Sequence, residues 1–130
     1  MPILSVPVTG LYAALFAVLL VALSINVIRC RVSARVGLGD GGDPSLLRAG
    51  RAQGNFIEYV PLALIVILAL ELNHAERALL HALGIALLLG RIAHAYALVT
   101  DSLRFRQAGM ILTFGVLLVG AVALLVTIPL

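Results

Sequence analysis

The chain contains no lysine, only one cysteine, and few charged residues of any kind. Nine basic residues, all arginine, and six acidic residues make the charged fraction of its 130 residues only 12%. Cys30 cannot form a disulfide within the chain or complete a Cys-x-x-Cys zinc pattern, and we interpret it as a small buried filler. Because no basic patch is interleaved with aromatic residues, the sequence argues against nucleic acid as a partner.

Hydrophobic residues, in contrast, make up 62% of the chain, and the mean hydropathy is +1.15. This composition excludes an ordinary soluble domain. About 20 apolar residues span a bilayer as a helix, so four such stretches use nearly the whole chain. We therefore predict an all-α integral membrane protein, a four-transmembrane-helix bundle that forms a single domain over residues 1–130. The helices are expected at about residues 8–35, 44–72, 74–99 and 103–128.

Local signals mark where some of these helices begin. The first apolar stretch has neither a basic leader nor a clear cleavage site, so we expect a retained helix and not a removed signal peptide. Asp43 followed by Pro44 is typical of a helix start. The run from Asn73 to Glu76 resembles a capping box and predicts that the third helix opens directly after a short hairpin. Gly37–Gly42 lacks the Gly-Lys-Ser/Thr ending of a phosphate loop and is interpreted as a connector.

The arginines predict an orientation in the membrane. The connector between the second and third helices has only Arg77, which Glu71 and Glu76 balance. Basic residues mark the cytoplasmic side of membrane proteins, so we expect the first and third connectors in the cytoplasm and both termini on the periplasmic side. The arginines in and beside those two connectors are Arg29, Arg31, Arg35, Arg48, Arg51, Arg104 and Arg106.

Polar residues interrupt the second and third apolar stretches at helical spacing. Arg48, Arg51, Asn55 and Glu58 are three or four residues apart, which places them on one face of a helix. Arg91 and His94 are one turn apart in the third helix. Charged side chains at membrane depth cost roughly 2.5–3.5 kcal/mol each on insertion scales, so they usually face a protein interior and mark function.

Two interpretations of these residues stay open at this stage. In a purely structural one, Glu58 neutralises Arg91 across the second and third helices. In a functional one, the arginines are too numerous to cancel internally and hold an anionic ligand. Glu58 would then bind an ammonium group while the arginines bind carboxylates, which suits a zwitterionic peptide with two carboxylates and one amine.

A metal site is not expected. His94 has no second histidine at ligand spacing and its polar neighbours are arginines. His74 and His81 belong to the other end of the third helix, and we interpret them as interfacial or packing residues.

The chain resembles the MAPEG family, the membrane-associated proteins in eicosanoid and glutathione metabolism, and in particular its small bacterial inner-membrane branch. The resemblance covers nearly the whole chain. It lies in the four apolar stretches and in three further features: the Gly-Asp-Gly-Gly loop at residues 39–42, the run RAQGNFIEYVP at residues 51–61, and the run GRIAH at residues 90–94. Arginines at the end of the first helix and the start of the fourth complete it.

This resemblance implies a homotrimer in the bacterial inner membrane, with glutathione bound between adjacent subunits near the cytoplasmic face. A lipophilic second substrate would enter from the bilayer, and the enzyme would be a glutathione transferase or peroxidase. Arg106, or alternatively Arg104, corresponds to the arginine that stabilises the glutathione thiolate. The positions that match glutathione-contacting residues are Arg29, Arg51, Asn55, Glu58, Arg91 and His94.

The chain also departs from the pattern of catalytic relatives. Leu98 stands where those relatives carry a tyrosine, and Gln107 and Met110 replace a serine and a second tyrosine in the fourth helix. The alternative is therefore a non-catalytic family member that binds lipids or a protein partner. A small multidrug-type transporter would need an acidic residue in the first helix, and residues 11–28 contain none.

Overall fold

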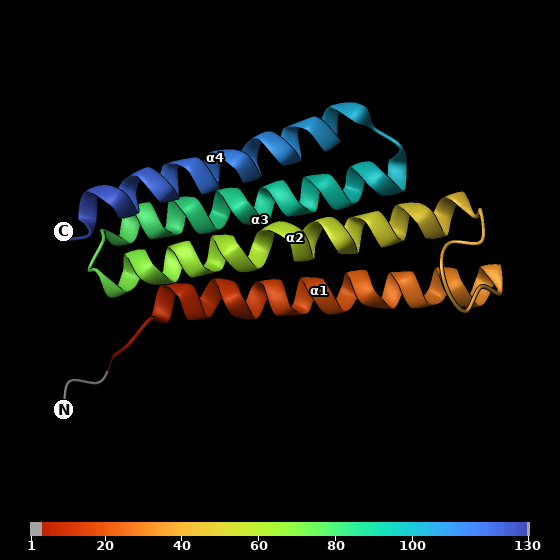
Figure 1. Cartoon of the computed structure of the whole chain (residues 1–130), viewed down its shortest axis with the longest axis horizontal. Helices are drawn as coiled ribbons and strands as arrows, with labels where there is room; N and C mark the ends of the chain where they lie inside the picture. Colours follow the sequence, from red (N-terminus) through yellow and green to blue (C-terminus); the bar gives the residue numbers. More distant parts are fainter. Residues whose placement is uncertain (1–3, 130) are drawn as a thin grey trace.

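The structure, a computed structural model, describes residues 4–129. Four helices and no strand account for these residues: α1 (Pro7–Ala34), α2 (Pro44–Leu72), α3 (Arg77–Thr100) and α4 (Leu103–Thr127) (Figure 1). Each helix is long and apolar enough to cross a membrane. This confirms the predicted all-α, four-helix membrane architecture.

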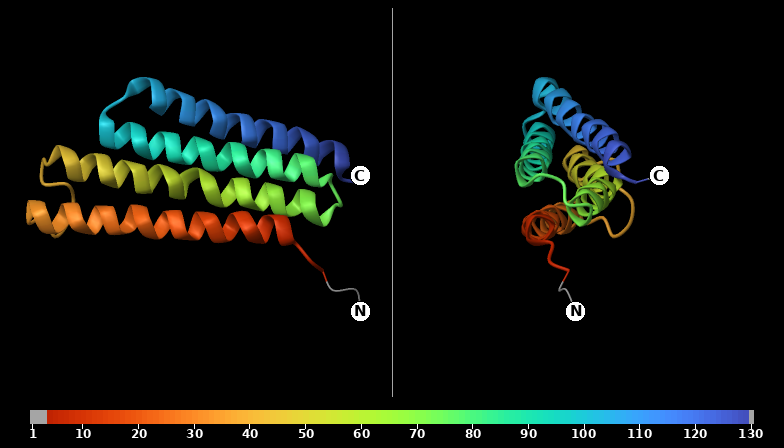
Figure 2. Two further views of the ribbon diagram at one scale, coloured as in Figure 1. Left: turned by 180° about the vertical axis from the view of Figure 1, so that it is seen from behind. Right: turned by 90° about the vertical axis from the view of Figure 1, so that its left-hand side faces the viewer.

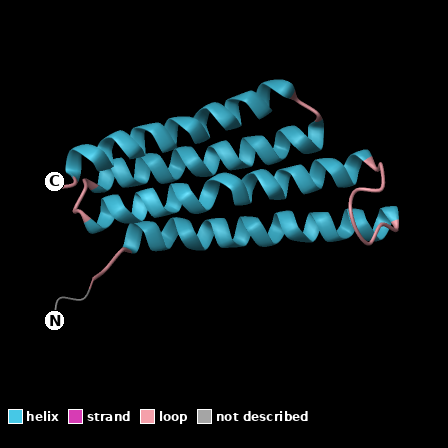
Figure 3. Cartoon of the chain, in the orientation of Figure 1, coloured by secondary structure: helices cyan, strands magenta, loops and turns pink. Residues whose placement is uncertain are grey.

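The helices lie antiparallel to their neighbours in chain order, with α1 and α4 on opposite sides of the bundle (Figures 1 and 2). α2 contacts the other three helices, α3 also contacts α1, and no contact joins α1 to α4 within the described residues. The start of α1 and the end of α4 lie at the same end as the α2–α3 turn, and the other two connections lie at the opposite end (Figure 3). We call that opposite end the arginine-rich end, because it carries the seven arginines of the first and third connectors.

The predicted start of α2 is confirmed. The Asp43 side chain accepts a hydrogen bond of 2.8 Å from the backbone N–H of Leu46, and Pro44 occupies the first helical position. Asp43 thereby satisfies one of the N–H groups that the first turn of a helix leaves free.

The predicted capping box at the start of α3 is wrong. The Asn73 side chain instead donates a hydrogen bond of 2.8 Å to the Ala69 carbonyl and closes α2. His74 has a left-handed backbone with φ of 59°, which interrupts the helical path. α3 therefore begins at Arg77, and its N-cap residue Glu76 makes no side-chain capping bond.

A carboxylate from another helix caps the start of α1. Glu71 accepts hydrogen bonds from the backbone N–H groups of Val8 and Thr9, at 2.9 and 2.7 Å. One turn further along α1, the Tyr12 hydroxyl lies 3.0 Å from Nδ1 of His81. His81 thus packs between α1 and α3, in agreement with the packing role expected for it.

The outer faces of the helices are apolar. Large hydrophobic side chains such as Val18, Ile111 and Leu118 are about two-thirds exposed in the single chain. Contiguous apolar surface of this kind is typical of a membrane or protein-contact surface. The helices therefore present to the bilayer the side chains that the hydropathy of the sequence predicts.

α3 and α4 approach most closely at two glycines. A methyl group added to Gly109 would lie 2.6 Å from the carbonyl oxygen of Gly90 and 2.9 Å from the backbone nitrogen of His94. Small residues of this kind let helix backbones meet in membranes. This contact brings α4 against the segment of α3 that carries Arg91 and His94.

We expect Gly109→Ala to separate α3 from α4 and destabilise the bundle by about 1–3 kcal/mol, the usual cost of overpacking. Gly115→Ala is the matched control, because an added methyl group there meets nothing within 4 Å. Thermal unfolding in detergent should show a lower Tm for Gly109→Ala alone. Equal Tm values for the two variants would contradict the close approach.

The arrangement of the helix ends also fixes which segments share a side of the membrane. An alkaline phosphatase domain fused at the C-terminus or inserted in the α2–α3 turn should be active in the periplasm of a bacterial host. Insertion in the Gly37–Gly42 connector should give an inactive domain. An active connector fusion would reverse the predicted orientation, and different results at the C-terminus and the α2–α3 turn would contradict the fold.

Candidate functional site

A buried guanidinium group joins three of the four helices. Arg91 of α3 is only 2% exposed. Its Nη1 donates a hydrogen bond to Oδ1 of Asn55 on α2, and its Nη2 donates one of 2.8 Å to Oγ1 of Thr113 on α4. We call Asn55, Arg91 and Thr113 the buried polar triad. Hydrogen bonding within the bundle is the expected way to accommodate such a group at membrane depth.

The alternative in which Glu58 neutralises Arg91 is wrong. Glu58 instead lies 3.6 Å from Nη1 of Arg51 on its own helix. Within residues 4–129, the ion pairs are this one and a contact between Arg48 and Asp101. The charge of Arg91 is therefore balanced by no acidic side chain of the described chain.

Arg51 and Glu58 form the open part of the site. Their side chains are 54% and 51% exposed, and an exposed ion pair of this kind stabilises a protein by only about 0–1 kcal/mol. Their charged ends are thus free to exchange one partner for another at little cost. On α2, the exposed Arg51–Glu58 pair thus lies close to Asn55, whose side chain is held by Arg91.

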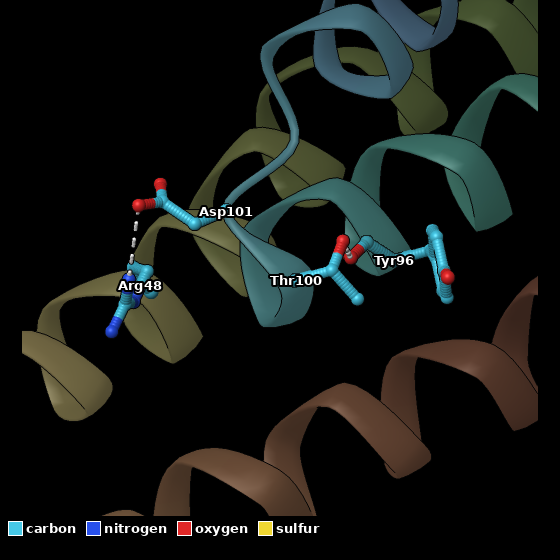
Figure 4. Close-up of polar contacts among 4 residues, drawn as sticks. All are labelled: Arg48, Tyr96, Thr100 and Asp101. Carbon is cyan, nitrogen blue, oxygen red and sulfur yellow. Dashed lines mark hydrogen bonds and ion pairs between the residues drawn. The ribbon is translucent and has the colours of Figure 1, made fainter.

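The fourth member of the predicted stripe has a different partner. Nη1 of Arg48 lies 3.7 Å from the Asp101 carboxylate at the end of α3, and Figure 4 shows the two side chains pointing toward each other. Arg48 therefore links α2 to the α3–α4 turn and takes no part in the buried polar triad.

His94 lies one turn beyond Arg91 and is 4% exposed. Its backbone packs against Gly109 of α4, at the close approach of the two helices. The structure thus places His94 one turn from Arg91, with both side chains buried in the bundle.

Arg29 is the predicted site residue on α1. It is exposed on α1, where it lines an open groove between α1 and the start of α2. Arg104 and Arg106 are both exposed in the first turn of α4. In the part of the chain that the structure describes, no cluster of three His, Cys, Asp or Glu side chains could hold a metal ion.

Three residues beside Arg91 were absent from the predicted site. Thr113 accepts its hydrogen bond, the Met110 sulfur lies 3.6 Å from Nη2, and the Tyr59 ring centroid lies 6.0 Å from Cζ. The signal for Thr113 was available in the sequence, since it is the one polar side chain in the long apolar part of α4. Its pairing with Arg91 depends on how α3 and α4 are rotated against each other.

Comparison with known proteins identifies the family. The sequence model of the MAPEG family matches residues 9–126. The chain belongs to the MAPEG family. It is 42% identical over 122 residues to the inner membrane protein YecN of Escherichia coli strain K12, a match that covers 94% of this chain and 93% of YecN. YecN of Escherichia coli O6:H1 matches to the same extent, and no solved structure matches the chain significantly.

The family assignment confirms the resemblance drawn from the two polar runs in α2 and α3. It also places the buried polar triad within the matched region of a MAPEG protein. The roles of the individual side chains in binding or catalysis stay predictions.

Thr113→Val should loosen the buried polar triad, because valine keeps the shape of threonine but leaves Nη2 of Arg91 without its oxygen acceptor. Hydrogen bonds to charged groups contribute about 1.5–3 kcal/mol, and we expect a clear fall in Tm. Thr127→Val is the matched control, since the Thr127 hydroxyl bonds only the Ala123 carbonyl of its own helix.

Thr113→Ser keeps the hydroxyl group and should restore most of the lost stability. A Tm for Thr113→Val as high as that of Thr127→Val would show that the bond between α3 and α4 contributes nothing.

Proposed function

We propose that this MAPEG protein binds glutathione, or a closely related thiol peptide, in the bacterial inner membrane and activates its thiol. The observation that carries the proposal is the uncompensated charge of Arg91. This guanidinium is buried, and its hydrogen-bond partners in the described chain are neutral. Its Nε has no hydrogen-bond partner among residues 4–129. A buried cation without a counter-charge is costly, and an anionic ligand would supply that charge.

The accessible part of the site suits a zwitterion. Arg51 and Glu58 offer charges of opposite sign, 3.6 Å apart and half exposed. A ligand with carboxylates and an ammonium group would replace their weak contact with two pairings of its own. Arg91 would remain fixed by Asn55 and Thr113, so the ligand would meet one rigid cation and one adjustable ion pair.

The proposed chemistry needs no nucleophile from the protein. Arg106 would stabilise the ligand's thiolate, which is the reactive form of a thiol, and the thiol proton would pass to solvent. The sulfur would then form a bond to an electrophilic carbon of a lipophilic substrate as that carbon's leaving group departs. Attack on a lipid hydroperoxide is the corresponding reduction: the thiolate displaces alkoxide from the peroxide bond, and a second thiol resolves the oxidised sulfur as a disulfide.

A homotrimer would explain the position of Arg29. In one chain it stands on α1, which makes no contact with α4, whereas Arg106 opens α4. We propose that Arg29 of the partner subunit completes each site. In the proposed trimer, Arg29 would complete the site of the neighbouring subunit.

A second candidate function, binding without catalysis, is favoured by the residue at position 98. Leu98 is buried where catalytic relatives are expected to have a tyrosine. Tyr96 points elsewhere: it is 54% exposed, and its ring packs edge-on against Phe105 at 5.2 Å. In this alternative, Arg106 is dispensable for function while ligand binding at α2 and α3 is retained.

Isothermal titration of glutathione into the purified, detergent-solubilised protein tests the proposal. Arg51→Ala and Glu58→Ala should each raise Kd about tenfold or more, since a charge-assisted hydrogen bond contributes about 1.5–3 kcal/mol. Arg77→Ala and Glu76→Ala make the same changes at the opposite end of the bundle and should leave Kd unchanged. Absence of glutathione binding to the folded wild-type protein would refute the proposal.

Conjugation of glutathione to chlorodinitrobenzene separates the two candidate functions. If the protein is a transferase, Arg106→Ala should lower kcat and move the pH profile of the reaction to higher pH, with Kd for glutathione little changed. Glutathione binding by a wild-type protein that neither conjugates this electrophile nor reduces a lipid hydroperoxide would favour the non-catalytic alternative.

A further inference from the structure

A cavity of about 180 Å³ lies among α1, α2 and α3, near the arginine-rich end of the bundle. Its lining includes none of the residues of the buried polar triad. The α2 residues that line it are Ser45, Arg48, Ala49 and Ala52, and neither Arg51 nor Glu58 is among them. The cavity therefore meets α2 at residues other than those assigned to the proposed thiol site.

The wall of the cavity changes in polarity along the bundle axis. Its inner part, toward the middle of the membrane, is formed by Leu23, Ala52 and Ala95. Its outer part is formed by Cys30, Ser45, Leu98 and Val99. Cys30 and Ser45 also line the open groove between α1 and the start of α2. The cavity thus has an apolar inner end and a mouth of mixed polarity that leads to the membrane surface.

Two polar side chains stand at the mouth without a full set of partners. Among the hydrogen bonds within residues 4–129, none uses the side chain of Asn26, which faces the cavity from α1. Among the described residues, the one ion pair of Arg48 is with the Asp101 carboxylate, at 3.7 Å with side-chain exposures of 39% and 85% (Figure 4). An ion pair this exposed is weak, so a second anion can compete with Asp101 for the guanidinium.

The size of the cavity limits what it can hold. An apolar cavity of about 150 Å³ accepts a benzene-sized molecule, whereas drug-sized ligands need about 300–1,000 Å³. A volume near 180 Å³ therefore suits a segment of one unbranched alkyl chain and is too small for a tripeptide. The positive charge at the mouth selects an anionic head group over a cationic one.

We propose that this cavity binds a single alkyl chain that carries an anionic head group, with the chain between Leu23, Ala52 and Ala95 and the head group at Arg48 and Asn26. An amphiphile in the bilayer already has this orientation, with its head group at the surface and its chain toward the midplane. Either a free fatty acid or one chain of an anionic phospholipid supplies this chemistry. The proposal does not depend on glutathione binding.

Cys30 gives a direct way to detect the ligand, because it is the only cysteine of the chain and lines the cavity. Its maleimide labelling rate is measured by mass spectrometry on the full chain in phosphatidylcholine nanodiscs. We expect dodecanoate to slow labelling strongly, dodecanol to slow it less, and dodecylamine to have the least effect. Slow labelling in phosphatidylglycerol nanodiscs without added dodecanoate would identify the phospholipid as the source of the chain. Protection by dodecylamine equal to that by dodecanoate would overturn the anionic head group.

Two charge variants test the head-group contact. Arg48→Gln should raise the dodecanoate concentration that gives half-maximal protection of Cys30 about fivefold, which is the effect of losing a partly exposed ion pair. The dodecanol concentration that gives half-maximal protection should stay unchanged. Arg77→Gln, the same change at the other end of the bundle, should alter neither value. Asp101→Asn should act in the opposite direction and lower the dodecanoate concentration, because it removes the competing carboxylate from Arg48. An unchanged value for Arg48→Gln would overturn the assigned head-group position.

Filling the inner end tests the chain contact. Ala52→Leu should abolish protection by dodecanoate, while Ala17→Leu, the same change on the exposed side of α1, should preserve it. Native mass spectrometry counts bound dodecanoate independently of Cys30, and circular dichroism checks folding; Ala52→Val replaces Ala52→Leu if the larger side chain prevents folding. Retained dodecanoate binding in a folded Ala52 variant, or no binding to the wild-type protein, would overturn the proposal.

Discussion

The position of Arg91 is the constraint on which the inner structure of this bundle depends. A guanidinium that is 2% exposed at membrane depth must find its partners inside the protein. It finds one on each of two neighbouring helices, Asn55 on α2 and Thr113 on α4. The close approach of Gly90 and Gly109 brings α4 within reach of α3. One hydrogen-bonded side chain therefore sets how three apolar helices are rotated against one another, which apolar packing alone specifies weakly.

The same residue connects the fold to the proposed function. The buried polar triad gives both Nη atoms of Arg91 neutral oxygen acceptors and leaves its Nε without a partner among residues 4–129, so no negative charge in the described chain offsets that of the guanidinium. Arg51 and Glu58 are charged as well, but half exposed and weakly paired. A rigid cation beside an adjustable ion pair is an arrangement that can orient a zwitterionic ligand without first reorganising the protein. The cavity among α1, α2 and α3 differs from this site, because it has an apolar inner end and a single arginine, Arg48, at its mouth.

The sequence predicted the fold and the polar positions within its helices because both depend on periodicity within one helix. Four apolar stretches could only be membrane helices, and Asn55, Arg91 and His94 stood out as polar residues within them. How the helices are rotated against one another could not be predicted from periodicity within one helix. Glu58 carries the charge needed to pair with Arg91. The rotation of α2, however, brings Asn55 and not Glu58 into hydrogen-bond contact with the Arg91 guanidinium. Asn73 matched a capping box in sequence, yet its side chain closes the preceding helix.

An experimental structure of the protein with glutathione bound tests the central claim most directly. The claim predicts a trimer with the ligand at the interface, a carboxylate of the ligand near Arg91 and Arg51, and Arg91 still bonded to Asn55 and Thr113. Glutathione bound away from α2 and α3, or an Arg91 that leaves the buried polar triad to reach it, would contradict the account.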